Sequence, residues 1–160
     1  MTFRQTLDKT DVMILDALMR NARLTYKEIG EIVGLTRPAA RERILRLEEL
    51  GVIKGYSAQI NTEMLGYSLR MIISFKFDPD RKFDGKPNDT LIPMLNAAPN
   101  VLRYWEIYGD LDFLIEAVFD SKDSTHSFLD DLRNYGFVRS HLVAAECEKS
   151  SIPPESALLL

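Results

Sequence analysis

The feature that most constrains the fold of this chain is a short G-L-T segment that separates two stretches with helical periodicity. Thr25 and Glu28 stand three residues apart at the start of the first stretch, where each side chain can bond the amide of the other in a capping box. Gly34 can take the left-handed conformation that ends this helix, and Thr36 can cap the next one. Pro38 is tolerated there because the amides of a first turn have no intrahelical partner. The sequence therefore predicts two helices joined by a tight turn.

A further helix is predicted upstream, in the stretch LDKTDVMILDALMRNAR, where Asp8 or Thr10 can cap the first turn. Each of the three helices presents an apolar stripe at helical spacing, so the stripes can be buried against one another. They consist of Ile14, Leu15, Leu18 and Ala22, of Ile29, Ile32 and Val33, and of Ala40, Ile44, Leu47 and Leu50. Gly51 ends the third helix, and residues 52–58 (VIKGYSA) predict a strand that is suited to a wing.

The third helix carries a large share of the positive charge of the chain. The whole chain has a formal net charge of -4, whereas residues 1–66 hold ten Lys/Arg against nine Asp/Glu. Between Thr36 and Leu47 the net charge is +3, from four arginines and one glutamate. Guanidinium groups match phosphate oxygens and the acceptor edge of guanine. Because a helix-turn-helix lays its second helix in the major groove, this charge favours a DNA-binding function.

The expected DNA contacts lie along the two helices and the strand after them. Bases are the expected partners of Thr36, Arg37 and Arg41, at the exposed start of the third helix. Phosphates are the expected partners of the basic residues further along, and of the first turn of the second helix where it crosses the backbone. The complete predicted set is Tyr26, Lys27, Thr36, Arg37, Pro38, Arg41, Arg43, Arg46 and Lys54.

Two interpretations of the arginines compete. Arg43 lies at the shoulder of the buried stripe, so contact with a phosphate and pairing inside the protein are equally expected. The third helix as a whole can also be a solvated amphipathic helix whose arginines pair with Glu42, Glu48 or Glu49 on neighbouring turns. The order of two capped helices, a basic helix and a strand favours DNA binding over this alternative.

The remainder of the chain alternates predicted strands and helices. Apolar and polar residues alternate from Leu69 to Phe77, which describes a strand with one buried face. The elements that follow are a helix over 91–98, strands over 101–108 and 112–119, a helix around 128–132 and a strand over 138–147. This βαββαβ order is typical of a ferredoxin-like sandwich. The predicted fold class is α+β, with a winged helix-turn-helix domain (residues 1–60), a linker (61–67), a ferredoxin-like domain (68–150) and a C-terminal tail (151–160).

The face of the predicted sheet that carries no helices is expected to be covered by a second copy of the chain. Its outward positions include large apolar side chains, which would make too apolar a surface to leave in water. They are Ile72, Leu102, Tyr104, Leu114 and Val118. A homodimer would relate two basic helices by a twofold axis, which suits half-sites about one DNA turn apart.

Residues for metal or thiol chemistry are scarce. Cys147 is the single cysteine, and His126 and His141 have no spacing that suggests a catalytic dyad. We therefore expect no catalytic residue, metal or cofactor, and a protein that is not an enzyme. The first residues lack the apolar core of a secretion signal, and no apolar run approaches the length of a membrane span. A cytoplasmic location without membrane partners is expected.

Several motifs of the chain resemble one family of regulators. They are L-D-x-x-D at the start of the first helix, G-L-T before the third helix, R-I-x-R-L-E within it, and G-V-I-x-G-Y after it. The stretch is similar to the DNA-binding domain of the leucine-responsive and asparagine regulators, the Lrp/AsnC family. The resemblance covers most of the chain, and it implies a transcriptional regulator whose ferredoxin-like domain dimerises and often binds an amino acid.

The resemblance also implies an effector site and a larger assembly. In this family dimers commonly form higher oligomers such as octamers, and an amino-acid effector lies between dimers near a G-D-x-D turn. Gly109, Asp110 and Asp112 match that turn and are the expected effector contacts. Gly-Asp-Leu-Asp between two strands is equally what a plain hairpin turn looks like. Two segments depart from the family pattern, the long DPDRKFDGKPND linker and the HLVAAECEK stretch, which lacks the usual hydroxyl-bearing residues.

Two other functions remain open at this point. One is a DNA-binding regulator that responds to oligomerisation or a partner protein instead of a metabolite. The other is an enzyme that resembles the siroheme decarboxylases, which pair the same two domains; the chain carries no basic-aromatic signature for tetrapyrrole chemistry.

Overall fold

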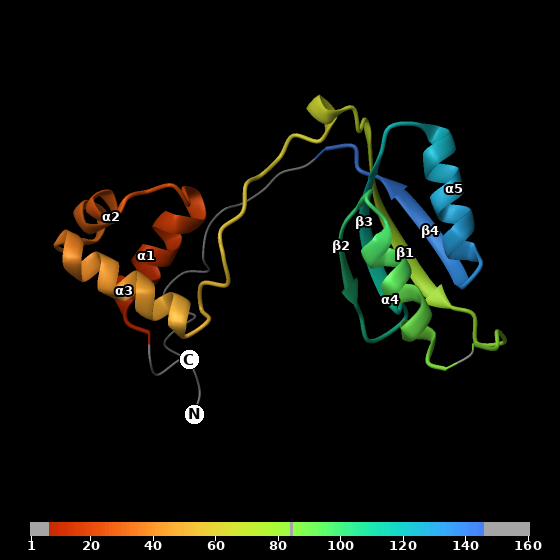
Figure 1. Ribbon diagram of the computed structural model, residues 1–160, viewed down its shortest axis with the longest axis horizontal. Helices are drawn as coiled ribbons and strands as arrows, with labels where there is room; N and C mark the ends of the chain where they lie inside the picture. Colours follow the sequence, from red (N-terminus) through yellow and green to blue (C-terminus); the bar gives the residue numbers. More distant parts are fainter. Residues whose placement is uncertain (1–6, 84, 146–160) are drawn as a thin grey trace. The chain divides into compact units, whose positions relative to one another are not determined.

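The computed structural model describes residues 7–83 and 85–145 of the 160-residue chain (Figure 1). These residues form two compact units, divided between Ala58 and Gln59. The C-terminal tail predicted for residues 151–160, and the end of the last predicted strand at Cys147, lie outside the described residues. Within the described ranges, no helix has the length and apolar character needed to cross a membrane.

The first unit is built from three helices, α1 (Lys9–Arg20), α2 (Tyr26–Val33) and α3 (Arg37–Glu49). Asp8 caps α1, where either Asp8 or Thr10 was expected, and the capping box of Thr25 and Glu28 forms as predicted. The core consists of Ile14, Leu18, Ile29, Ala40, Ile44 and Leu47. Three predicted core residues lie outside it, because Ile32 is 52% exposed on α2, while Ala22 and Leu50 follow the ends of α1 and α3.

The strand predicted for residues 52–58 is wrong, because this segment has no strand in the structure. Instead, the amides of Val52 and Ile53 donate to the carbonyl oxygen of Leu47 at 3.0 and 3.1 Å, which folds the segment back on the end of α3. A strand-like segment forms a strand only where another strand pairs with its backbone amides and carbonyls. Within the described residues of this unit there is no strand, so the amides bond the helix.

The second unit contains a four-stranded antiparallel sheet and two helices in the predicted βαββαβ order. Its elements are β1 (Leu69–Phe77), α4 (Pro87–Ala97), β2 (Val101–Glu106), β3 (Phe113–Phe119), α5 (Lys122–Arg133) and β4 (Gly136–Leu142), preceded by the short helix η2 (Glu63–Leu65). The strand order in the sheet is β2-β3-β1-β4. Three strands differ in extent from the prediction: β2 stops at Glu106 rather than at residue 108, β3 begins at Phe113 rather than at residue 112, and β4 spans Gly136–Leu142 rather than 138–147. The α+β fold class is confirmed.

The core of the second unit lies between one face of the sheet and the helices α4 and α5 (Figure 1). β1 and β3 pair over seven residues, from Leu69 opposite Phe119 to Phe75 opposite Phe113. Alternate residues of these central strands meet α4 and α5, and the others line the second face of the sheet, here called the open face. The buried core consists of Met71, Ile73, Phe75, Leu91, Leu95, Phe113, Ile115, Ala117, Phe119, Phe128, Leu129 and Leu132.

One residue predicted for the open face, Tyr104, lies on the helix side instead. Its ring packs against the core, and its hydroxyl donates to the side-chain oxygen of Asn96 on α4 at 2.9 Å. The register of β2 shifts between Val101 and Arg103, and such a bulge reverses the alternation of side chains beyond it. As a result Trp105, opposite Leu114, takes the open-face position.

Candidate nucleic-acid interface

The turn between α2 and α3 depends on two glycines. Gly34 ends α2 with φ 73° and ψ 32°, the left-handed conformation predicted for it. Gly30 is buried inside α2, and its carbonyl oxygen accepts the amide of Leu35 at 2.8 Å. A Cβ atom at Gly30 would stand 2.5 Å from the carbonyl oxygen of Leu35, too close for van der Waals contact. The close approach of the turn to α2 therefore requires glycine at this position, which the sequence prediction missed.

The start of α3 presents the residues that were expected to contact bases. The Thr36 hydroxyl caps the helix by accepting the amide of Ala39 at 3.4 Å, and Pro38 occupies the first turn. Thr36, Arg37, Pro38 and Arg41 are all exposed, whereas Ala40, Ile44 and Leu47 form the buried stripe of α3. Among the described residues, neither Arg37 nor Arg41 has a carboxylate within ion-pair distance. Two guanidinium groups and a hydroxyl are thus presented to solvent at one end of this helix.

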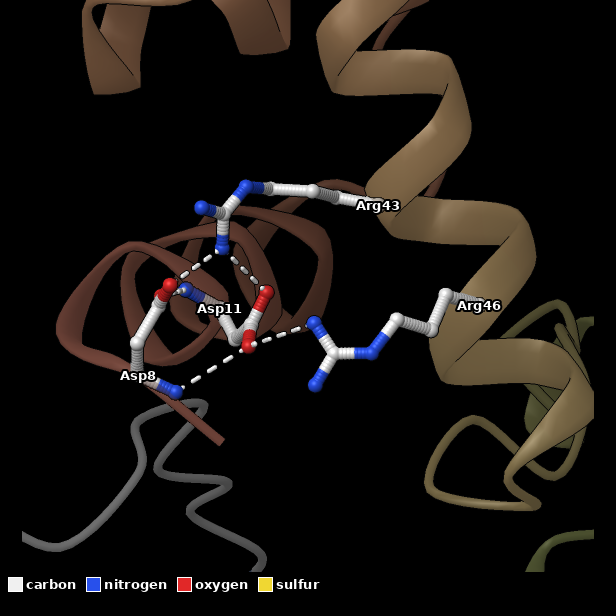
Figure 2. Close-up of polar contacts among 4 residues, drawn as sticks. All are labelled: Asp8, Asp11, Arg43 and Arg46. Atoms are coloured by element: carbon white, nitrogen blue, oxygen red, sulfur yellow. Dashed lines mark hydrogen bonds and ion pairs between the residues drawn. The ribbon is translucent and has the colours of Figure 1, made fainter. Parts of the chain in front are cut away.

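Arg43 points the other way, into the protein (Figure 2). Its Nη1 atom donates to Asp8 Oδ2 at 2.6 Å and to Asp11 Oδ1 at 2.9 Å, and its side chain is 29% exposed. Of the two roles predicted for this arginine, the structure therefore contains the internal pair. The two carboxylates raise the pKa of Arg43, and the hydrogen bond from Arg43 is the main cause that lowers the pKa of Asp8.

Asp11 is the centre of this cluster and is fully buried. Its Oδ2 accepts the amide of Asp8 at 3.0 Å, while the Asp8 carboxylate accepts the amide of Asp11 at 2.9 Å, which completes a capping box. The same Oδ2 lies 3.6 Å from Nη1 of Arg46, one turn along α3 (Figure 2). The two aspartates thereby join the start of α1 to the middle of α3. The L-D-x-x-D motif was the sequence signal for this contact, but it does not indicate which arginines the aspartates meet.

The remaining predicted DNA contacts lie on α2 and in the segment after α3. Tyr26 is half-buried at the first turn of α2 and packs against the core. Lys27 is exposed and lies 3.8 Å from Glu31 in a solvent-exposed pair, which leaves its ammonium group accessible. Lys54 is exposed in the segment that follows α3, although that segment is not the predicted strand.

Tyr56 links the segment after α3 back to the helix by a hydrogen bond, a role that the sequence prediction did not include. Its hydroxyl donates to Glu48 Oε1 at 2.8 Å, while its ring remains about half exposed. Burial, together with this hydrogen bond to a carboxylate, raises the pKa of Tyr56 to about 12. Glu48 therefore bonds this tyrosine rather than an arginine of α3.

The three predicted effector residues lie in the turn between β2 and β3 and have different surroundings. Gly109 has a positive φ of 139°. The Asp112 carboxylate accepts the amide of Phe77 at 2.7 Å, so it ties the turn to the end of β1. Asp110 instead lines a groove of about 640 Å³, together with Lys76, Arg139 and His141 among others. In the described part of the chain, no group of three or more His, Cys, Asp or Glu side chains could hold a metal ion.

Comparison with known proteins gives a consistent set of matches. A family model described as winged helix-turn-helix DNA-binding matches residues 7–54. An uncharacterised HTH-type transcriptional regulator from Pyrococcus abyssi is 39% identical over 128 residues, covering 79% of this chain and 80% of that protein. The regulator LrpA from Bacillus subtilis is 32% identical over 138 residues, covering 86% and 97%. The structure of the transcriptional regulator NMB0573 from Neisseria meningitidis, a complex with L-Met, matches with a TM-score of 0.82 at 26% identity, covering 95% and 99%.

The helix-turn-helix geometry and these matches define the class of the protein, which is that of the helix-turn-helix transcriptional regulators. The similarity extends into the second unit as well, because the alignments with the Pyrococcus abyssi and Bacillus subtilis regulators each include more than three quarters of this chain. Within this class the chain belongs to the Lrp/AsnC family, as its motifs indicated.

Proposed function

We propose that this chain regulates transcription as a homodimer that inserts the start of α3 into the major groove of double-stranded DNA. The observation that carries the proposal is the exposure of Thr36, Arg37 and Arg41 at the start of α3, where neither arginine pairs with a carboxylate of the described residues. In this proposal residues 1–60 form the DNA-binding domain and residues 68–150 the assembly domain. Tyr26, Lys27, Arg46 and Lys54 contact phosphates, while Arg43 orients α3 from inside.

The DNA-binding proposal is tested by measuring binding to genomic fragments that the protein selects, using fluorescence anisotropy. Replacing Arg41 with alanine should weaken binding to the selected site by about 1–3 kcal/mol and relax the preference at one base pair. Arg133→Ala is the matched control, since it removes one exposed arginine from the second unit. Equal losses on selected and unrelated DNA would reassign Arg41 to a phosphate. Binding that does not weaken as salt rises would count against the whole proposal, because counterion release accompanies phosphate contacts.

The open face of the sheet is the surface we propose for dimerisation. Ile72 and Leu114 are half-buried there, and Trp105 and Phe137 are 43% and 61% exposed. Large apolar side chains at adjacent sheet positions are typical of a surface that another subunit covers. Higher oligomers would follow from contacts between such dimers.

An amino-acid effector at the turn between β2 and β3 is the finer proposal. The groove beside Asp110 offers a carboxylate for an ammonium group, and Lys76 and Arg139 for a carboxylate. The L-Met complex of the similar Neisseria meningitidis protein supports an amino acid as the ligand. Calorimetric titration of the full-length protein with a panel of amino acids should give heat for at least one of them, and Asp110→Asn should weaken that binding.

A regulator without an effector is the second candidate, and the bonding of Asp112 favours it. Because its carboxylate holds the amide of Phe77, part of the G-D-L-D motif has a structural use that needs no ligand. In that case no amino acid would release heat, while DNA binding would depend on protein concentration through assembly. Since the relatives are transcriptional regulators, we propose that the chain acts by binding and not by catalysis. Porphyrin-like absorbance in the purified protein would revive the decarboxylase alternative.

A further inference from the structure

A pocket of about 430 Å³ lies between α4 and α5, at the end of the sheet opposite the turn that contains Asp110. The turn and the pocket are at opposite ends because β2 and β3 are antiparallel: the turn joins their near ends, and Asn100 and Asp120 flank their far ends. The wall of the pocket is apolar where it meets the core. Phe119 and Phe128 are buried there, with ring centroids 5.6 Å apart, and Met94 of α4 faces them.

The polar side of the pocket is acidic. Asp120 and Asp131 line it with Ser124 and Ser127, and none of the described residues in its lining is a lysine, arginine or histidine. The Asp120 carboxylate accepts the hydroxyl of Ser124 at 2.6 Å, and this hydrogen bond is the main cause that lowers the pKa of Asp120. Two carboxylates without a basic partner in the lining favour a ligand with positive charge.

Asn100 adds an unused hydrogen-bond donor. Its side-chain nitrogen is buried and has no hydrogen-bond partner among the described residues, although the residue lines the pocket. The backbone of Asn100 is fixed, because its carbonyl oxygen accepts the amide of Val118 at 2.9 Å. Buried donors are normally paired in native proteins, so this amide is a polar group that the fold leaves unsatisfied beside the pocket. Its nitrogen has almost no exposed surface, so other atoms form the surface that a ligand in the pocket would contact.

We propose that this pocket is a second small-molecule site, which binds an organic cation with an apolar body. The cationic group lies near Asp120 and Asp131, and the apolar body packs on Phe119 and Phe128. The groove beside Asp110 has the opposite character, since Lys76 and Arg139 line it. The two sites therefore select different ligands, and this inference does not depend on the proposed effector.

Calorimetry with three compounds of similar shape tests the charge preference in the full-length protein at low ionic strength. Phenylalaninol is the cationic probe, N-acetylphenylalaninol the neutral one and N-acetylphenylalanine the anionic one. Phenylalaninol should bind at least about threefold more tightly than the neutral probe, the size of an exposed charge interaction, and the anion should not bind. Equal or tighter binding of the anion, or no binding of phenylalaninol at millimolar concentration, would overturn the proposal.

Three variants locate the binding in the pocket. Asp131→Asn should weaken phenylalaninol binding about two- to fivefold, whereas Asp130→Asn should not, because Asp130 pairs with Arg133 and does not line the pocket. Ser127→Phe should abolish binding by filling the space between the helices. Urea unfolding followed by the fluorescence of Trp105, the single tryptophan, shows whether each variant keeps a folded second unit. Binding that persists in a folded Ser127→Phe protein would place the ligand elsewhere and refute the site.

Discussion

Replacing Asp11 by asparagine removes the charge that joins α1 to α3 while keeping the size of the side chain. The Asp11 carboxylate is fully buried, accepts from Arg43 at 2.9 Å and from the amide of Asp8 at 3.0 Å, and lies 3.6 Å from Arg46. Asparagine keeps one acceptor oxygen but turns an NH₂ group toward a donor. Either the capping bond or the guanidinium bond is then lost.

The expected cost follows from the exposure of the partners. Breaking a fully buried ion pair from one side costs about 3–5 kcal/mol, and a hydrogen bond to a charged group contributes about 1.5–3 kcal/mol. The side chains of Arg43 and Arg46 are 29% and 42% exposed, so water can hydrate both guanidinium groups once asparagine replaces Asp11. The lower range therefore applies, and we expect Asp11→Asn to lower the free energy of unfolding of the first unit by about 2 kcal/mol.

Urea unfolding followed by two probes measures this effect within one protein. Far-UV circular dichroism reports mainly the helices, and Trp105 fluorescence reports the second unit alone. The helical transition of the first unit should move to lower urea while the fluorescence transition stays in place. Asp8→Asn is the matched control, because asparagine is an equally good cap and the Asp8 side chain is 52% exposed. A loss below about 0.5 kcal/mol for Asp11→Asn, or an equal loss in the control, would refute the central role of Asp11.

Three further predictions use the same protein. Gly30→Ala should lower the stability of the first unit by about 1–3 kcal/mol in the same assay, since its Cβ would meet the carbonyl oxygen of Leu35; unchanged stability would contradict this. Because the folded state raises the pKa of Tyr56 to about 12, its contribution is complete below the unfolded value of about 10 and is lost as pH rises toward 12. Tyr56→Phe should remove this contribution to the alkaline loss of stability, and the late phase of tyrosine ionisation that Tyr56 gives in ultraviolet absorbance should be missing from the variant. Ile72→Glu should lower the mass found by sedimentation equilibrium to that of a monomer; an unchanged mass would exclude the open face as the dimer surface.

Local chemistry made the helical part of the fold predictable from the sequence. The capping box at Thr25, the left-handed Gly34 and the cap at Thr36 act within four residues along the chain, so the sequence states them completely. The βαββαβ order was predictable for a similar reason, since short apolar segments mark the strands and one of them, residues 69–77, alternates apolar and polar residues. The strand predicted for residues 52–58 did not form, because the amides of Val52 and Ile53 found an acceptor on α3 rather than on another strand.

The candidate site was predictable in part. Exposure of Arg37 and Arg41 follows from the position of the buried stripe on α3, which periodicity gives directly. The partners of Arg43 could not be predicted from periodicity, because Asp8 and Asp11 are more than thirty residues away along the chain. Likewise, a single bulge in β2 moved Tyr104 to the helix side, and no local pattern indicates where an extra residue enters a strand.

The sequence by itself determined the three helices of the first unit, the βαββαβ order of the second unit and the exposure of Arg37 and Arg41, because these depend on residues that are neighbours along the chain. Only the tertiary structure decided that Asp11 holds α3 through Arg43, that Gly30 must lack a side chain, and that the amide of Asn100 has no partner in a pocket wall. Each of these depends on distances between atoms brought together by packing, and packing distances are set by the whole core.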